Sequence, residues 1–239
     1  MLKNLFFFTV SVLLLTMTSV SAEEQGELIF TDDFERSESQ EAKDQPGNGW
    51  GTNSRTRAKG NKQVDLRDGA MYIYIHKTAD HGVSVTHTAE FKDGAVGMRF
   101  MLKNQGDSLG LNFADLQYKQ VHAGHLFVAK ISTKSIQLQD LKTGNMDLKI
   151  REARKAKATS ESQNKLLKTK ALNVPHSLEV GKWYDLLVTV EGDLLSLSID
   201  GEELARFQSE GIAHPTKRLL RLAVPKNAVV DDVNIWRKR

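Results

Sequence analysis

Apolar residues in this chain occur mostly in short segments, and in several segments they alternate with polar residues. Between residues 195 and 200, leucine and isoleucine alternate with serine and aspartate, the period of two expected of a strand with one wet face. Short turns that contain glycine, such as residues 191–193, separate neighbouring segments. The pattern predicts strands over residues 28–34, 64–66, 70–76, 82–87, 95–102, 109–113, 126–132, 135–141, 182–191, 194–200, 203–208, 219–224 and 228–236. Strands joined by tight turns predict an antiparallel, all-β fold.

Two segments interrupt the strand pattern. Residues 35–62 are polar and rich in glycine, asparagine and serine, which predicts a long surface loop of the kind that often carries function. Residues 146–173 are dense in lysine and arginine and contain neither glycine nor proline. Within them, Ser160 and Gln163 have the spacing of a capping box, which predicts a helix through Lys170 that Pro175 ends. This basic segment is either a solvated connection at the edge of the fold or a lid over one sheet face, suited to an anionic ligand.

The N-terminal residues have the features of a targeting segment. Lys3 supplies a positive charge, residues 5–15 form an apolar core, and Val20-Ser21-Ala22 are small residues at the cleavage positions. We therefore predict a signal peptide over residues 1–22, cleaved after Ala22. Its apolar run of roughly 11 residues is shorter than the ~20 that span a bilayer, so we expect no membrane association after its removal. These features predict an exported protein, periplasmic or extracellular, with one domain over residues 23–239.

The composition limits the chemistry. The chain contains no cysteine, which excludes thiol catalysis, thiolate zinc sites and disulfides. Its formal net charge of +3 is too small to indicate a general nucleic-acid binder. We expect a monomer that does not bind nucleic acid.

The two ends of the chain carry a resemblance. Residues 30–34 (Phe-Thr-Asp-Asp-Phe) and 229–236 resemble the strands that open and close family 16 glycoside hydrolases, which are concanavalin A-like jelly rolls. Residues 180–184 (Val-Gly-Lys-Trp-Tyr) and 198–203 (Ser-Ile-Asp-Gly-Glu-Glu) resemble a pattern shared by laminin-G-like domains and the 3-keto-disaccharide hydrolase domain. His214-Pro215, followed by a strand and the acidic closing strand, favours the latter family. The resemblance implies a two-sheet antiparallel jelly-roll sandwich with one short helical, basic insertion.

The catalytic motif of family 16 is missing. Those enzymes place two glutamates on one strand, so that a nucleophile and an acid/base flank the sugar bond. The nearest string, residues 191–196 (Glu-Gly-Asp-Leu-Leu-Ser), lacks the second glutamate and falls in a predicted turn. Retaining glucanase chemistry of this type is not expected, and whether the protein is an enzyme stays open.

Four residues are the candidates for acid or base chemistry. His122 and His125 have a spacing that would bring two imidazoles together, and histidine titrates near neutral pH. Glu90 and Asp115 flank strands in the middle of the chain, where glycoside cleavage would need carboxylates. The alternative is that the histidines are structural or surface residues, and that Asp115 is a turn residue.

Four aromatic residues are the candidates for stacking against a sugar. Tyr72 and Tyr74 share one face of a predicted strand, because side chains repeat every second residue. Trp50 lies between two glycines of the long loop, and Tyr118 follows a central strand. Core packing is the alternative for Trp50, and we assign Trp183 and Trp236 to the core.

The resemblance to family 16 also implies a structural calcium ion shared by the first and last strands. Asp33 and Asp231 fall on the corresponding positions, and calcium binds carboxylate and carbonyl oxygens. The alternative is that these aspartates are solvated and that the protein has no cofactor.

We therefore expect a saccharide-active or saccharide-binding jelly-roll protein, with an acidic saccharide as ligand if the basic segment faces the site. The alternatives are a non-catalytic carbohydrate-binding module and a laminin-G-like interaction module.

Overall fold

The computed structural model describes residues 25–238, so the predicted signal peptide lies outside the described residues. Among these residues, no helix is long and apolar enough to cross a membrane. The elements, in chain order, are β1 (Glu27–Asp32), β2 (Gly51–Thr52), α2 (Ser54–Arg57), β3 (Val64–Arg67), β4 (Ala70–Tyr74), β5 (Val83–Phe91), β6 (Asp93–Met101), β7 (Ser108–Ala114), the 3-10 turn η1 (His122–Gly124), β8 (His125–Ser132), β9 (Ser135–Asp140), α3 (Leu148–Lys155), α4 (Glu161–Thr169), β10 (Ala171–Pro175), β11 (Trp183–Glu191), β12 (Leu194–Ile199), β13 (Glu202–Gln208), β14 (Lys217–Val224) and β15 (Asn227–Lys238).

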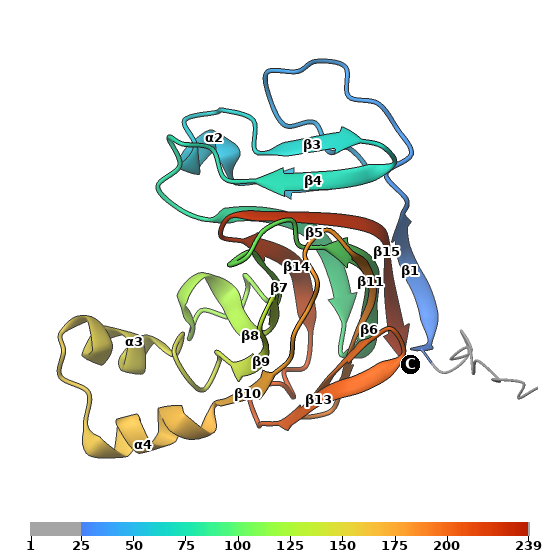
Figure 1. The fold of residues 1–239 in the computed structure, drawn as a ribbon. Helices are drawn as coiled ribbons and strands as arrows, with labels where there is room; N and C mark the ends of the chain where they lie inside the picture. The colour runs from blue at the N-terminus through green and yellow to red at the C-terminus, as the bar shows by residue number, and fades with distance from the viewer. Residues whose placement is uncertain (1–24, 239) are drawn as a thin grey trace, which may run out of the picture.

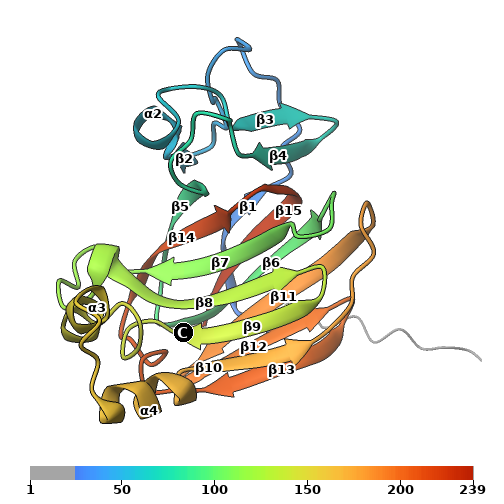
Figure 2. The ribbon, with the colours of Figure 1, turned by 60° about the vertical axis from the view of Figure 1, so that its left-hand side comes forward.

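The strands form two antiparallel sheets packed face to face (Figures 1 and 2). The eight-stranded sheet has the order β13-β12-β11-β6-β15-β4-β3, with β1 paired to β15. The seven-stranded sheet has the order β10-β9-β8-β7-β14-β5-β2. The predicted two-sheet jelly-roll sandwich is confirmed, and the opening and closing strands lie side by side as the sequence indicated.

Alternating side chains build the core between the sheets. In β11, Tyr184, Leu186 and Val188 are buried and point inward, while Asp185 and its odd-numbered neighbours point outward. The hairpin from β11 to β12 closes through Gly192 and Asp193, and Gly192 has a φ of +58°, which favours glycine. Every residue of β7 is buried, including those on its outer face. The outer face of β7 is therefore crowded by side chains and loops around it.

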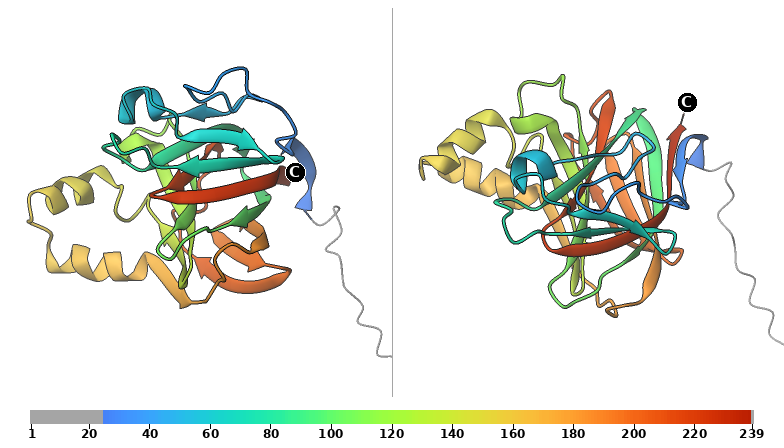
Figure 3. Two further views of the ribbon diagram at one scale, coloured as in Figure 1. Left: turned by 45° about the horizontal axis from the view of Figure 1, so that its top comes forward. Right: turned by 90° about the horizontal axis from the view of Figure 1, so that it is seen from above.

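The basic segment differs from the prediction of a single helix. It contains two helices, α3 and α4, which project from one end of the sandwich (Figure 3). The capping box predicted at Ser160 is confirmed, because its hydroxyl accepts from Gln163 N and the Gln163 side chain accepts from Ser160 N. The helix ends at Thr169 with Lys170 as its C-cap, close to the predicted end at Lys170. The following residues pair with β9 as strand β10, because their backbone groups extend the sheet edge.

Three carboxylates, Asp32, Glu38 and Asp44, hold the long loop after β1 in place, and Asp32 anchors its start. Asp32, which is 4% exposed, forms an ion pair with Arg36 at 2.6 Å between Oδ1 and Nη1. Its Oδ2 accepts a hydrogen bond from Nε1 of Trp50 at 2.8 Å. Buried polar groups without partners are costly, so these contacts fix the loop in one arrangement.

Candidate functional site

The outer face of the seven-stranded sheet carries a polar cluster at its centre. Strand β7 is the fourth of seven, and β14 lies beside it. Asn112 on β7 is directly opposite Arg221 on β14, and residues directly opposite each other point to the same face. Leu111 and Phe113, the chain neighbours of Asn112, pack in the core, so Asn112 and Arg221 face outward.

His125 joins this pair from the start of β8. Its Nδ1 lies 2.8 Å from Oδ1 of Asn112 and 3.2 Å from Nη1 of Arg221. Asn112 Oδ1 can only accept and the Arg221 guanidinium can only donate, so the two contacts require opposite protonation states of Nδ1. The shorter contact, to Asn112, places the proton of the neutral imidazole on Nδ1, and Arg221 Nη1 then donates to Asn112 Oδ1 at 3.4 Å instead of to His125. Arg221 Nη2 also donates to the carbonyl of Ala123 at 2.7 Å, which ties the guanidinium to the preceding turn.

The environment keeps His125 uncharged. Burial, together with the positive charge of Arg221 and the neighbouring His122 and His81, lowers the pKa of His125 to about 4. In the described part of the chain, the only buried side-chain nitrogen or oxygen without a partner is His214 Nδ1. Nε2 of His125 has no partner either, so it must reach the surface. His125 can therefore accept a hydrogen bond there at neutral pH.

His122 links the sheet to the basic segment. The rings of His122 and His125 have centroids 6.4 Å apart, as the sequence spacing suggested. Nη2 of Arg151, on α3, lies 3.5 Å from Nε2 of His122. Partial desolvation and the charges of Arg151 and Lys155 lower the pKa of His122. We call Asn112, His122, His125, Arg151 and Arg221 the cationic cluster, because its only permanent charges are the two arginines.

Asp115 supports the loop that carries the histidines, and its role differs from the prediction. It is 3% exposed, and its Oδ2 contacts Nε2 of His214 at 3.1 Å and Nη1 of Arg218 at 2.7 Å. Burial raises the pKa of Asp115, but the hydrogen bonds from His214 and Gln117 N and the charge of Arg218 outweigh it and lower that pKa. A buried carboxylate with these partners has a structural role here, so the geometry does not support the prediction of Asp115 as a catalytic group.

The conformation of the same loop requires a glycine at position 124 and determines how Tyr118 packs. Gly124 has a φ of +71°, and a Cβ there would lie 2.5 Å from the carbonyl oxygen of Asp115. Only glycine therefore lets the loop close, with Asp115 N donating to Gly124 O. Tyr118 packs edge-on against His214 at 4.9 Å between ring centroids, and Lys142 lies over the Tyr118 ring. Tyr118 thus braces the loop instead of presenting a free ring to a sugar.

Glu90 does not join the cationic cluster. It is exposed near the end of β5, and β14 separates that strand from β7. The structure therefore brings together only two of the four predicted catalytic residues, His122 and His125. The two residues that complete their environment, Asn112 and Arg221, were missed because no sequence motif marks them.

The predicted stacking aromatics are dispersed. Trp50 is 7% exposed and packs with Phe30, Phe34 and His87, so the core alternative for it holds and the stacking prediction is wrong. Tyr72 and Tyr74 do share one face of β4, but on the eight-stranded sheet, away from the cationic cluster. Arg67 and Lys103 lie over the ring of Tyr72 at 4.1 and 5.3 Å from its centroid.

The aspartates predicted to bind calcium have other partners. Asp33 Oδ1 accepts from Glu35 N at 3.1 Å, and Asp231 Oδ2 accepts from Nη1 of Arg99 at 3.3 Å. Within residues 25–238, no group of three histidine, aspartate or glutamate side chains could hold a metal ion. Calcium requires several oxygen ligands, and a guanidinium beside them opposes a cation, so these side chains do not form a calcium site as arranged. The calcium ion stays a prediction that the geometry does not support.

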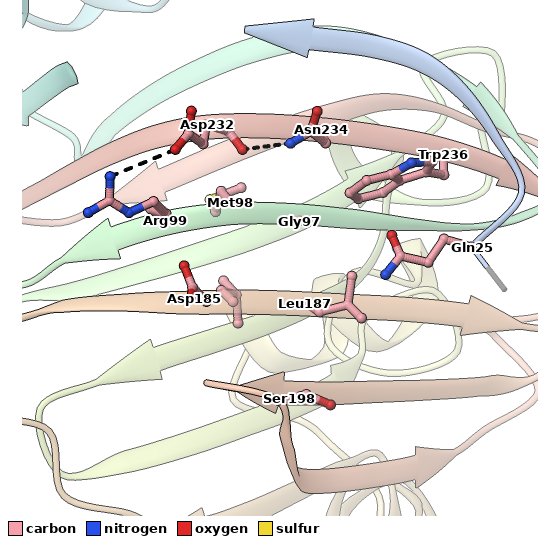
Figure 4. A pocket seen from close by; sticks show the side chains of 12 residues that line it. Gln25, Gly97, Met98, Arg99, Asp185, Leu187, Ser198, Asp232, Asn234 and Trp236 are labelled. Carbon is pink, nitrogen blue, oxygen red and sulfur yellow. Dashed lines mark hydrogen bonds and ion pairs between the residues drawn. The ribbon is translucent and has the colours of Figure 1, made fainter. Parts of the chain in front are cut away.

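The assignment of Trp183 and Trp236 to the core is wrong. Both are half-buried on the outer face of the eight-stranded sheet, where Trp236 lines a groove together with Arg99, Asp185 and Asn234 (Figure 4). The sequence contains a signal for this: Trp183 is two residues from Asp185, and Trp236 is two residues from Asn234. Side chains two apart in a strand share a face, so the polar residues mark the face of each tryptophan.

No family model matches this chain, and no curated protein sequence matches it. The resemblance to 3-keto-disaccharide hydrolases therefore rests on the sequence segments described above. Similar solved structures do exist. A non-specific endo-β-1,3(4)-glucanase from family GH16 matches with a TM-score of 0.58 and 13% identity, over 89% of this chain and 91% of that chain. The laminarinase from Rhodothermus marinus matches with a TM-score of 0.58 and 11% identity, over 88% of this chain and 97% of that one.

A third match is a protein of unknown function with a galectin-like fold from Bacillus subtilis. It has a TM-score of 0.56 and 14% identity, over 90% of this chain and 99% of that chain. Identities this low carry the fold and no function, since one superfold serves many functions. The fold of this protein is a concanavalin A-like jelly roll of the kind found in glycoside hydrolases.

Proposed function

We propose that this protein binds an acidic saccharide at the cationic cluster on the outer face of the seven-stranded sheet. The observation that carries the proposal is the placement of Arg221 beside a neutral His125 and Asn112 on adjoining strands. The likeness to glucanases in fold supports a saccharide, and the charge of the cluster supports an acidic one.

The cluster offers the groups that an acidic sugar needs. A guanidinium has more N–H donors than the contacts of Arg221 use, and its planar fork fits a carboxylate or sulfate. The open Nε2 of His125 can accept a hydroxyl proton, and the amide nitrogen of Asn112 can donate. Arg151 and Lys155 of α3 add two positive charges beside His122, and Glu152, which pairs with both, offsets one of them. The basic segment thereby acts as the edge of the site, which is the second of its two sequence interpretations.

A hydrolytic function is the second candidate, and His125 is the residue that favours it. Its imidazole is neutral, oriented through Nδ1 and open at Nε2, which is the geometry of a general base, although a pKa of about 4 makes it a weak base at neutral pH. The described residues offer no carboxylate pair at the cluster, because Asp115 is buried in ion pairs and Glu90 lies on β5. Release of reducing ends from acidic polysaccharides, lost in His125→Gln with binding retained, would establish this function.

The binding proposal is tested by affinity measurements on matched charge variants. Oligogalacturonate is the acidic probe, and a neutral oligosaccharide of equal length is the comparison. Arg221→Gln should weaken oligogalacturonate binding about tenfold or more, because a charge-assisted hydrogen bond contributes ~1.5–3 kcal/mol. Arg206→Gln is the control, because Arg206 pairs with Glu203 on the surface of the eight-stranded sheet. Equal binding by both variants, or a preference for the neutral probe, would refute the proposal.

Export is part of the proposal. The signal-peptide features of residues 1–22 support it, and N-terminal sequencing of the mature protein should begin at or near Glu23. A mature chain that still begins at Met1 would contradict it.

A further inference from the structure

A groove lies on the outer face of the eight-stranded sheet (Figure 4), and the cationic cluster lies on the other sheet of the sandwich. Its volume is about 460 Å³, within the range of sites for small ligands. Side chains from β15, β6 and β11 line it, among them Trp236, Arg99 and Asp185.

The indole of Trp236 forms an aromatic platform in the groove, next to the backbone of Gly97. A Cβ at Gly97 would lie 2.9 Å from Cζ3 and 3.0 Å from Cη2 of the Trp236 ring. The absence of a side chain at Gly97 lets this edge of the indole approach the backbone of the sheet. The half-buried indole borders the groove (Figure 4), where it offers apolar area to a flat ligand.

The polar groups around this platform are mostly acceptors. The carboxylate of Asp185 has no partner among the described residues. Asn234 donates through Nδ2 to the carbonyl of Asp232 at 2.9 Å, which leaves its Oδ1 open. Arg99 supplies donors and is held by Asp231 at 3.3 Å, by Asp232 at 3.7 Å and by the ring of Trp183 at 4.9 Å from its centroid.

The charge of the groove selects against anions. One arginine, Arg99, and two aspartates, Asp185 and Asp232, line the groove, and Asp231 pairs with the same arginine, so the local charge is negative. A carboxylated or sulfated sugar would be repelled here, whereas hydroxyl groups would find both acceptors and a donor. The two faces of the sandwich thus have opposite electrostatic character.

We propose that this groove is a second saccharide site, which binds a neutral pyranose stacked on Trp236. Its hydroxyl groups are held by Asp185, Asn234 and Arg99. The site is independent of the cationic cluster, and together the two sites would let one molecule hold an acidic and a neutral glycan on opposite faces.

The test uses the tryptophan side chains as reporters. In ¹⁵N-tryptophan-labelled protein each of the three indoles gives one Nε1–H signal, assigned with Trp236→Phe and Trp183→Phe. The probes are cellohexaose, laminarihexaose, mannohexaose and xylohexaose, with oligogalacturonate as the acidic comparison. We expect at least one neutral probe to shift the Trp236 signal while the signal of Trp50, whose Nε1 is bonded to buried Asp32, stays unchanged.

Variants separate loss of the site from loss of the fold. Trp236→Ala should weaken the neutral probe about tenfold, as expected for a lost stacking contact of ~1.5 kcal/mol. Asp185→Asn keeps the shape and should weaken the same probe, whereas Arg221→Gln should leave it unchanged. No shift of Trp236 with any neutral probe, or a shift with oligogalacturonate alone, would overturn the proposal. Because Arg221→Gln reports only on the cationic cluster, failure at one site is distinguishable from failure at the other.

Discussion

Nδ1 of His125 lies 2.8 Å from Oδ1 of Asn112, which fixes the tautomer of the imidazole and turns Nε2 toward the outer face of the sheet. The contact joins two adjacent strands at a bulge, where Ala114 is opposite His125. Arg221 approaches the same pair from the strand on the other side of β7. One imidazole is thus oriented by an amide and kept neutral by burial together with a guanidinium.

The pKa of His125 should respond to the charge of Arg221. The folded-state pKa of about 4 lies below the ordinary value of 6.5, so the unfolded chain binds this proton more tightly. The stabilising contribution of neutral His125 is therefore complete above pH 6.5 and is lost as the pH falls toward 4. Arg221→Gln should raise this pKa, because it removes the nearest positive charge. Titration of the imidazole signals by NMR measures it, and an unchanged value in Arg221→Gln would contradict the assignment.

The Asp115 ion pairs should matter for stability and indirectly for binding. Asp115→Asn leaves His214 and Arg218 without their shared carboxylate, and breaking a buried pair typically costs ~3–5 kcal/mol. Because Arg218 is partly exposed, we expect the lower end of that range. Denaturant unfolding measures the loss. A variant as stable as the parent would show that the pairs do not hold the loop.

Trp50 should behave as a core residue and not as a ligand contact. Trp50→Ala should lower the free energy of unfolding by ~3–5 kcal/mol, as is typical of buried aromatic truncations. Trp50→Phe keeps most of the packing but loses the hydrogen bond to Asp32, so a smaller loss is expected. Saccharide affinity of the folded Trp50→Phe protein should equal that of the parent. A selective loss of affinity would restore Trp50 as a binding residue.

The calcium prediction can be decided by thermal unfolding with and without chelator. A calcium ion bound only to the folded state at 100 times its dissociation constant would add roughly 2.7 kcal/mol. Since Asp231 is engaged by Arg99, we expect no change of Tm on addition of chelator. A drop that Asp231→Ala reproduces would establish the metal site after all.

The strands could be predicted because their two-residue period is visible within a few consecutive residues. Helix α4 could be predicted because its capping box also lies within four consecutive residues. Helix α3 also has a local signal that was overlooked, the side chain of Asp147 accepting from Ile150 N at 3.0 Å. The candidate sites depended on pairing between distant strands. Asn112 and Arg221 meet only through the register of β7 and β14, which no local pattern reveals. Trp50 was predicted to stack on a sugar because the residues around it are polar, whereas its side chain is in fact buried.

The most direct test of acidic-saccharide binding is a chemical-shift titration of ¹⁵N-labelled protein with oligogalacturonate at low ionic strength. Exposed charges are screened beyond ~8–10 Å at physiological salt, so low salt gives the cluster its full effect. The account predicts shifts at the side-chain amide of Asn112, the imidazole of His125 and the guanidinium of Arg221, all weakened by added salt. Shifts absent from these groups, or confined to Trp236 and its neighbours, would contradict it.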